Sequence, residues 1–299
     1  MRPGARVLIL VFVLCGVPLI ADNFADAFQQ ALTLYRNGRY AEAEQAFLAL
    51  AHRSNVRQRG RDEAYGRAVY CAVRQKMFDK AFDLASNIKR EPVRKYYRME
   101  ILKNQRKYDQ ILGLLREEDL SQWPDRLIHR AALCRGRIHA RKNNARVAED
   151  DFLLAKKLTM YPRELARVNV ALARLYRDAF KEPKKALTFF AESAELPYHL
   201  DITTRGIPEY ARLLVAQGNK NEAISLLNGN RQAIDDPRDE FRFFRCYGDV
   251  YAAAGKAQKA SSYYQKALKV PNAPRRRVRD LKEQIRERRE KTESQSAEP

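Results

Sequence analysis

Residues 244–267 read FRCYGDVYAAAGKAQKASSYYQKA, and this stretch decides the fold. A small residue, Gly248, is followed by a turn residue, Gly255, and then by a second small residue, Ala260, 12 positions after the first. An aromatic residue, Tyr264, comes four positions later. Small and aromatic residues at these spacings lie on single faces of helices with 3.6 residues per turn. The stretch therefore predicts two helices that are joined by a tight turn and approach closely at the small residues.

The same template recurs along most of the chain. The second small or apolar position of each copy lies at Ala43, Ala81, Ile111, Ala148, Ala186, Ala223 and Ala260, at intervals of 38, 30, 37, 38, 37 and 37 residues. Five of six intervals agree within one residue, and a period of this length indicates stacked structural repeats. A single helical pair cannot bury its apolar face alone, so neighbouring pairs must stack. We expect the large residue of each copy to fill the space under the next unit.

Turn-forming residues support the same division. Four copies have Asn or Gly between the two helices, where a positive φ is often required: Asn37-Gly38, Asn143-Asn144, Gly218-Asn219 and Gly255. Prolines fall between successive pairs, where they end helices: Pro92, Pro124, Pro162, Pro197, Pro237 and Pro271. Pro208 is an exception, and it suits a helix only in the first turn.

These patterns resemble the tetratricopeptide repeat. The resemblance covers roughly residues 24–271 and is strongest in the first, fourth and seventh copies. It implies an all-α fold, a right-handed α-solenoid of about seven antiparallel helix pairs. It also implies that the first helices line a concave surface, which in this family commonly holds a partner's peptide. The chaperone-binding members use a clamp with Asn one position after the first small residue, and this chain has no Asn there, so we do not expect that function.

Residues 1–21 have the layout of a secretory signal peptide. Arg2 and Arg6 precede an uncharged apolar run, Val7–Ile20, and Ala21 is a small residue suited to cleavage. The run is shorter than the roughly 20 residues that a helix needs to span a bilayer. We therefore expect export, with the periplasm as the destination and secretion or anchoring by an uncleaved signal as alternatives. The expected domains are the signal peptide (1–21), the repeat array (22–271) and a basic capping helix with a disordered tail (272–299).

Composition narrows the function. The 57 Lys and Arg residues outnumber the 37 Asp and Glu residues, which gives a formal net charge of +20, and 45% of the chain is hydrophobic. These values exclude a disordered acidic chain, a collagen and a polytopic membrane protein. No metal-ligand spacing, CxxC pair, phosphate-binding loop or hydrolase motif occurs, so we predict neither an enzyme nor a cofactor or metal. We expect three cysteines to be small buried residues: Cys71, Cys134 and Cys246.

Arginine is concentrated on one stripe of the first helices. In the fourth to seventh copies, 10 of 20 stripe positions are Arg and two are acidic. Lys and Arg together make up 57 of the 299 residues, and this frequency predicts only about four basic residues at 20 positions. Guanidinium groups suit carboxylates because they offer two parallel donors. The alternative is that these arginines pair with Glu and Asp on neighbouring helices. The candidate partner-binding arginines are Arg130, Arg137, Arg141, Arg167, Arg174, Arg177, Arg212, Arg242 and Arg245.

Two tyrosines take the corresponding positions in the second and third copies. Tyr70 and Tyr96 stand there among residues of mixed charge, and they suit a peptide with an apolar anchor. We therefore add both tyrosines to the candidate partner-binding residues.

The segment after Pro274 differs from the repeats. Val278, Leu281 and Ile285 lie at helical spacing, enough for one side of a helix to dock. A solvent-facing capping helix is the favoured interpretation, because solenoids need one at their ends. The alternative is a basic arm for a polyanion or an anionic lipid surface.

We predict an exported, non-catalytic protein-binding scaffold that holds an acidic or C-terminal peptide segment of an envelope partner in an Arg-rich concave groove. The alternative is a helical module associated with an enzyme or a polyanionic polymer of the cell wall or surface. The basic pI of about 9.9 would suit nucleic acid as a partner, but the expected export conflicts with such a partner, so nucleic acid is not expected. No stable membrane span is expected after removal of the signal.

Overall fold

The structure, a computed structural model, describes residues 23–116, 120–196, 203–231, 234 and 237–296. These residues are helical apart from turns and short connections, and no strand occurs among them. The prediction of an all-α fold is confirmed. The expected signal peptide, residues 1–21, lies outside the described residues.

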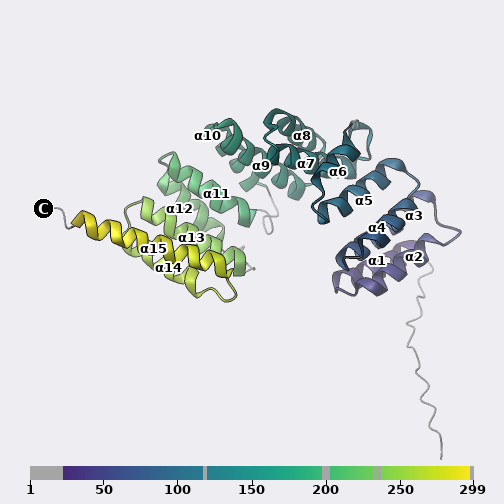
Figure 1. Cartoon of the computed structure of the whole chain (residues 1–299), viewed down its shortest axis with the longest axis horizontal. Coiled ribbons are helices and arrows are strands. Elements are labelled where there is room, and N and C mark those ends of the chain that lie inside the picture. The colour runs from purple at the N-terminus through teal and green to yellow at the C-terminus, as the bar shows by residue number, and fades with distance from the viewer. Residues whose placement is uncertain (1–22, 117–119, 197–202, 232–233, 235–236, 297–299) are drawn as a thin grey trace, which may run out of the picture. The chain divides into compact units, whose positions relative to one another are not determined.

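Fifteen α-helices follow one another in the part of the chain that the structure describes, as seven pairs and a final helix (Figure 1). The first three pairs are α1 (Phe24–Arg36) and α2 (Tyr40–Ala51), α3 (Gln58–Arg74) and α4 (Phe78–Ser86), and α5 (Glu91–Asn104) and α6 (Tyr108–Leu115). The next four are α7 (Asp125–Arg141) and α8 (Ala145–Leu158), α9 (Pro162–Leu175) and α10 (Pro183–Ala194), α11 (Thr203–Ala216) and α12 (Lys220–Gly229), and α13 (Pro237–Ala253) and α14 (Ala257–Lys269). The final helix is α15 (Arg275–Ser296), and two short elements are a 3-10 turn, Leu120–Gln122, and a π-helical turn, Tyr176–Phe180, which continues α9.

The chain divides into two compact units, residues 1–107 and 108–299. The first unit contains α1 to α5, and the second contains α6 to α15. Within each unit a helix packs on the helices next to it in sequence, and first helices also pack on first helices, as α3 does on α5 and α11 on α13. This sequential packing makes the fold an α-solenoid, as predicted.

The small residue of the first helix packs against the large residue of the second helix of the same pair. A Cβ added at Gly136 on α7 would lie 2.6 Å from Cε1 of Phe152 on α8. At Gly248 on α13 the corresponding distance to Cε1 of Tyr264 on α14 would be 2.3 Å. At these two copies the ring therefore occupies room that the glycine of its own pair leaves.

All seven turns between paired helices share one backbone feature. The residue five positions before the second small or apolar position has a positive φ, between 59° and 87°. These residues are Gly38, Lys76, Arg106, Asn143, Lys181, Gly218 and Gly255. The four turns expected from Asn and Gly are thus confirmed, and three further turns adopt the same conformation with Lys or Arg. Left-handed backbone costs a residue with a Cβ about 1 kcal/mol, so Lys76, Arg106 and Lys181 adopt a less favoured conformation than glycine would.

Pro197, expected between two pairs, lies outside the described residues. Pro92 and Pro162 lie between pairs as expected, and each occupies the first turn of the helix that follows, α5 and α9. Pro208 does not, because it is the sixth residue of α11 and lies inside that helix. A proline there removes one intrahelical hydrogen bond. The contacts of α11 with α10, α12 and α13 offset that loss, and the expectation of a first-turn proline is wrong.

No disulfide forms between the cysteines of the described residues. Cys71 and Cys246 are buried, as predicted, whereas Cys134 is half-buried on α7. Burial raises the pKa of Cys71 and of Cys246 to about 12, so both thiols stay protonated near neutral pH. Among the described helices, none combines the length and the apolar character that a membrane crossing requires.

The contact at Gly248 leads to a test of the packing. Gly248→Ala should lower the free energy of unfolding by about 1–3 kcal/mol, because the new Cβ overlaps the ring of Tyr264. The matched control is Gly113→Ala on α6, where a Cβ would meet nothing within 4 Å. This control should be neutral or stabilising by up to about 1 kcal/mol, since alanine favours helix. Denaturant titration measures both, and equal effects of the two variants would contradict the packing argument.

The turn at Lys76 leads to a second test. Lys76→Gly should stabilise the first unit by up to about 1 kcal/mol, because glycine adopts a φ of 63° without steric cost. Lys76→Ala removes the same exposed side chain but keeps the Cβ, so it should give no gain. Thermal unfolding of the two variants checks this, and a similar melting temperature for both would show that the turn carries no strain.

Candidate functional site

Ion pairs join the first helices of the second unit to one another. In the first of these links, Arg130 on α7 lies 3.6 Å from Glu164 on α9. Arg167, one turn after Glu164 on the same helix, donates to both oxygens of that carboxylate, at 2.9 and 3.1 Å. Glu164 is buried, and it therefore ties the two predicted arginines to one place between α7 and α9.

The second link joins α9 to α11. Nε and Nη2 of Arg174 donate to the two oxygens of Glu209 at 3.0 and 2.5 Å, and Nη1 of Arg177 donates to the same carboxylate at 2.9 Å. Burial opposes ionisation of Glu209, but the hydrogen bonds from the two arginines outweigh burial and hold the pKa of Glu209 below its ordinary value. Two-pronged pairing of this kind is the strong form of a guanidinium–carboxylate contact.

Two further links continue the series. Nε of Arg212 on α11 donates to Oδ2 of Asp249 on α13 at 3.2 Å. Nη2 of Arg245 on α13 donates to Oε1 of Gln284 on α15 at 2.9 Å. We call these four connections rungs: Arg130–Glu164, Arg174–Glu209, Arg212–Asp249 and Arg245–Gln284. The rungs join α7 to α9, α9 to α11, α11 to α13 and α13 to α15, in that order. The structure thus brings these predicted arginines together in one row.

Arg137 lies in this row without a carboxylate partner. Its side chain is exposed, and none of the described residues accepts a hydrogen bond from it. Surrounding protein nevertheless desolvates the guanidinium, and the charges of Arg174 and Arg167 act in the same direction, so the pKa of Arg137 is lowered. A side chain that touches solvent but is partly desolvated by protein and repelled by two cations is well placed to attract an anion. We define the arginine row as Arg130, Arg137, Arg167, Arg174, Arg177, Arg212 and Arg245.

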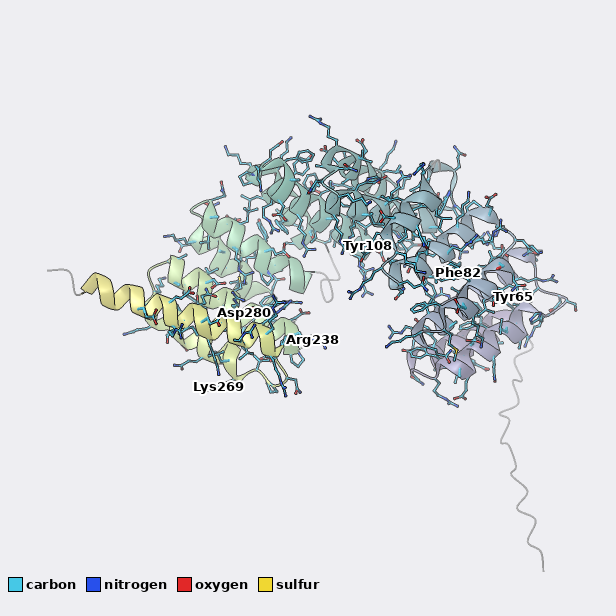
Figure 2. All side chains as sticks on the ribbon, in the orientation of Figure 1. Tyr65, Phe82, Tyr108, Arg238, Lys269 and Asp280 are labelled. Carbon is cyan, nitrogen blue, oxygen red and sulfur yellow. The ribbon has the colours of Figure 1, made fainter. Side chains whose placement is uncertain are left out.

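The last two predicted arginines take different places. Arg141, at the end of α7, stacks over the ring of Tyr108 with its Cζ 4.8 Å from the ring centroid, and Tyr108 begins α6 (Figure 2). Arg242 pairs with Asp239, three residues earlier on α13, and lines a hollow beside Arg245.

Two adjoining hollows lie beside the arginine row. The first has a volume of about 290 Å³ and lies between α9, α11, α13 and α15. In Figure 2, the label Arg238 marks the start of α13 and the label Asp280 marks α15, two of the helices around this hollow. This hollow is lined by Arg174, Pro208, Glu209, Arg212, Phe241, Arg242, Arg245 and Arg277. The second has a volume of about 490 Å³ and is lined by Arg174, Arg177, Glu209, Arg212, Leu213 and Ala216. Glu209 is the single carboxylate in either lining.

The row is less cationic than the sequence alone suggested. Six of the nine predicted arginines pair with carboxylates, so the alternative of internal pairing holds for most of them. Two of the carboxylates, Glu164 and Asp239, precede an arginine by three positions, and this helical spacing is a signal that sequence analysis could have used. Glu209 had no such signal, because it meets Arg174 only when α9 and α11 pack together.

The two predicted tyrosines belong to the first unit and do not form an exposed anchor. Tyr96 is only 2% exposed, and its hydroxyl lies 2.9 Å from that of Tyr70. Both rings pack edge-on against Tyr97, at 5.2 and 5.3 Å between centroids. Tyr97 in turn fills the space that Gly66 leaves open. Tyr96 is therefore a core residue, because the aromatic cluster of α3 and α5 covers it, and its prediction as a surface contact is wrong.

No group of side chains that could hold a metal ion occurs within the described residues. The site consists of guanidinium groups, a few carboxylates and apolar walls, which can bind an anionic group but offer no nucleophile paired with a base.

Comparisons with known proteins agree with this architecture. No protein-family model matches the sequence, and no curated protein matches it. Among solved structures, a tetratricopeptide repeat protein from Parabacteroides merdae is similar, with a TM-score of 0.52 and 14% identity over 86% of this chain and 96% of that one. The human IFIT1 dimer with PPP-AAAA is also similar, with a TM-score of 0.51 and 19% identity over 84% of this chain and 55% of that one. At these identities the likeness shows the fold, and the predicted tetratricopeptide-type fold is confirmed.

The second rung leads to a test that depends on pH. Glu209→Gln should destabilise the protein by about 1–2 kcal/mol at neutral pH, because Arg174 loses its carboxylate partner and Arg177 keeps only Asp178. Since the pKa of Glu209 is lowered in the folded state, its stabilisation is present above the ordinary glutamate pKa of about 4.3 and is lost as the pH falls through the lower folded value. The difference between the two proteins should be constant from about pH 8 to 5 and shrink below about pH 4.

Denaturant titrations at several pH values measure this difference. The matched control is Glu283→Gln, which removes an exposed carboxylate on α15 that has no hydrogen bond to the described residues. This control should change stability little at any pH. A Glu209→Gln effect that does not shrink in acid would contradict the ion-pair assignment.

Proposed function

We propose that this protein is a non-catalytic scaffold that binds a partner protein along the arginine row, and that the bound segment is an acidic or C-terminal peptide. The observation that carries the proposal is the convergence of arginines from α9, α11, α13 and α15 around two hollows whose linings contain a single carboxylate. The fold supports it, because a solenoid offers an extended surface to which successive repeats contribute equivalent positions.

The internal carboxylates leave donors for a ligand. A guanidinium group has five N–H donors, and in the third rung Arg212 donates to Asp249 through Nε alone. Arg137 gives no donor to any described residue. The carboxylates also hold the arginine side chains in place, so a peptide meets a partly ordered surface and less side-chain entropy is lost on binding.

We also propose, from the pattern of residues 1–21 alone, that the chain is exported and that the partner belongs to the cell envelope. Positively charged residues followed by an apolar run and a small residue are what supports this proposal. A fusion of residues 1–30 to a reporter enzyme that is active only after export tests it, and an inactive fusion would contradict it.

Peptide binding can be tested with one variant that breaks no ion pair. An acidic decapeptide of alternating Glu and Asp with a fluorescent label should bind at low salt and more weakly at about 300 mM salt. Arg137→Glu should weaken this binding by roughly tenfold, because it places in the arginine row a negative charge that repels the acidic peptide. The matched control is Arg146→Glu on the second helix α8, an exposed residue without a hydrogen bond to the described residues, and it should change affinity by less than about twofold.

Equal losses for the two variants would contradict the proposal, because they would indicate attraction to the overall charge of +20 rather than to the row. Pull-down from an envelope extract, with a purified wall polymer as a second ligand, then identifies the natural ligand. If this protein retains the polymer but no envelope protein, and Arg137→Glu abolishes that retention, the polyanion-binding alternative is favoured.

A further inference from the structure

The series of rungs ends on an uncharged side chain. In the first three rungs the arginine meets a carboxylate on the next helix, but at the fourth Arg245 meets the amide oxygen of Gln284. An amide can accept the hydrogen bond but cannot neutralise the charge. The C-terminal end of the row therefore differs in charge from the other three rungs.

Among the described residues, no carboxylate accepts a hydrogen bond from Arg245. The nearby carboxylate of Asp249 already accepts hydrogen bonds from Arg212 at 3.2 Å, from Tyr264 at 2.9 Å and from Gln284 at 3.1 Å. Nε of Arg245 is buried and has no acceptor among the described residues. A buried donor without an acceptor is costly, and an anion that draws the guanidinium toward the hollow would offset that cost.

The first hollow lies directly at this end of the row. Its lining has five arginines from four helices, namely α9, α11, α13 and α15, against one carboxylate, Glu209. Outside the lining, Asp249 and Asp239 pair with Arg212 and Arg242. The volume of about 290 Å³ exceeds what a carboxylate group alone would occupy, and Phe241 and Pro208 give part of the wall an apolar surface.

We propose that the hollow between α9, α11, α13 and α15 is a binding site for a phosphate monoester. A phosphate monoester carries a charge of about −1.5 to −2 near pH 7 and has three acceptor oxygens in different directions. Guanidinium groups that come from four helices can approach such a tetrahedral group from several sides, whereas a planar carboxylate accepts its strongest contacts in one plane. The proposal rests on the proposed function, in that a phosphorylated side chain of the bound peptide would carry the group.

The proposal gives α15 a role beyond that of a cap. Leu281 is fully buried and docks this helix on the second unit, as the sequence predicted. Arg277 and Gln284, four residues before and three after it, lie on the side of α15 that meets the hollow and α13. The final helix thus takes the place of the next first helix in the series and supplies a cation and a neutral amide where the other rungs have an acid.

The experiment uses the full chain and phenyl phosphate as the probe, with glutarate as a dicarboxylate of similar charge. Isothermal titration calorimetry at pH 7.5 should show binding of phenyl phosphate that is at least roughly fivefold tighter than that of glutarate, and weaker at pH 5.5, where the monoester gains a proton. Arg245→Gln should weaken the binding of phenyl phosphate by roughly tenfold. Gln284→Glu, which gives the fourth rung the acid of the others, should do the same.

Two controls keep the outcome unambiguous. Arg146→Gln removes one positive charge from α8 and should leave the affinity unchanged. Gln284→Glu places a second acid beside Asp249, so thermal unfolding must show that this variant still folds. If it does not fold, Arg245→Gln tests the proposal independently. Equal affinity for phenyl phosphate and glutarate, no binding at millimolar concentration, or full affinity of folded Arg245→Gln would each overturn the proposal.

The acidic decapeptide separates this proposal from the scaffold function. If the decapeptide binds and responds to Arg137→Glu while phenyl phosphate does not bind, the phosphate site is overturned and the scaffold stands. If phenyl phosphate binds and depends on Arg245 while the decapeptide does not bind, the hollow recognises phosphate without the proposed peptide function.

Discussion

The close contact between a small residue on the first helix and a large residue on the second is the constraint on which the structure depends. Gly136 faces Phe152, and Gly248 faces Tyr264, at distances where no Cβ would fit without movement of the ring. This contact sets how deeply the two helices of a pair approach each other. The large residue is buried as a result, with Phe152 only 2% exposed. Because one template repeats, each pair presents the same faces to its neighbours, and the pairs can stack.

Stacking decides which distant residues meet. Arg174 and Glu209 are 35 positions apart, Arg212 and Asp249 are 37 apart, and both pairs lie within hydrogen-bond distance. The separation matches the repeat length, so a charge at a given place in one copy meets a charge in the next. The arginine row is therefore a product of periodicity, and its partial neutralisation has the same origin. A row that keeps some carboxylates binds anions less strongly than an all-arginine surface, but its side chains are better ordered.

The uneven end of the row gives the site a direction. Three rungs close on an acid, whereas the fourth closes on Gln284, which brings no negative charge to Arg245 where α13 meets α15. An extended ligand that lies along the row would place its most negative group at that end, because the attraction between charges is strongest where few counter-charges lie nearby. Under the proposed function, the final helix completes a binding surface as well as covering the last pair.

Much of this molecule follows from the sequence alone. The spacing of small and aromatic residues predicted the helix pairs, their number and four of the seven turns, because close helix packing and left-handed turns demand particular residue types. The arginine stripe was visible too, since it follows the same period. Only the tertiary structure revealed that Lys76, Arg106 and Lys181 adopt the left-handed turn, that Pro208 lies inside a helix and that Tyr96 is a core residue. It also decided the charge of the site, because Glu209 and Gln284 reach their arginines only through the packing of neighbouring helices, and no local spacing records that contact.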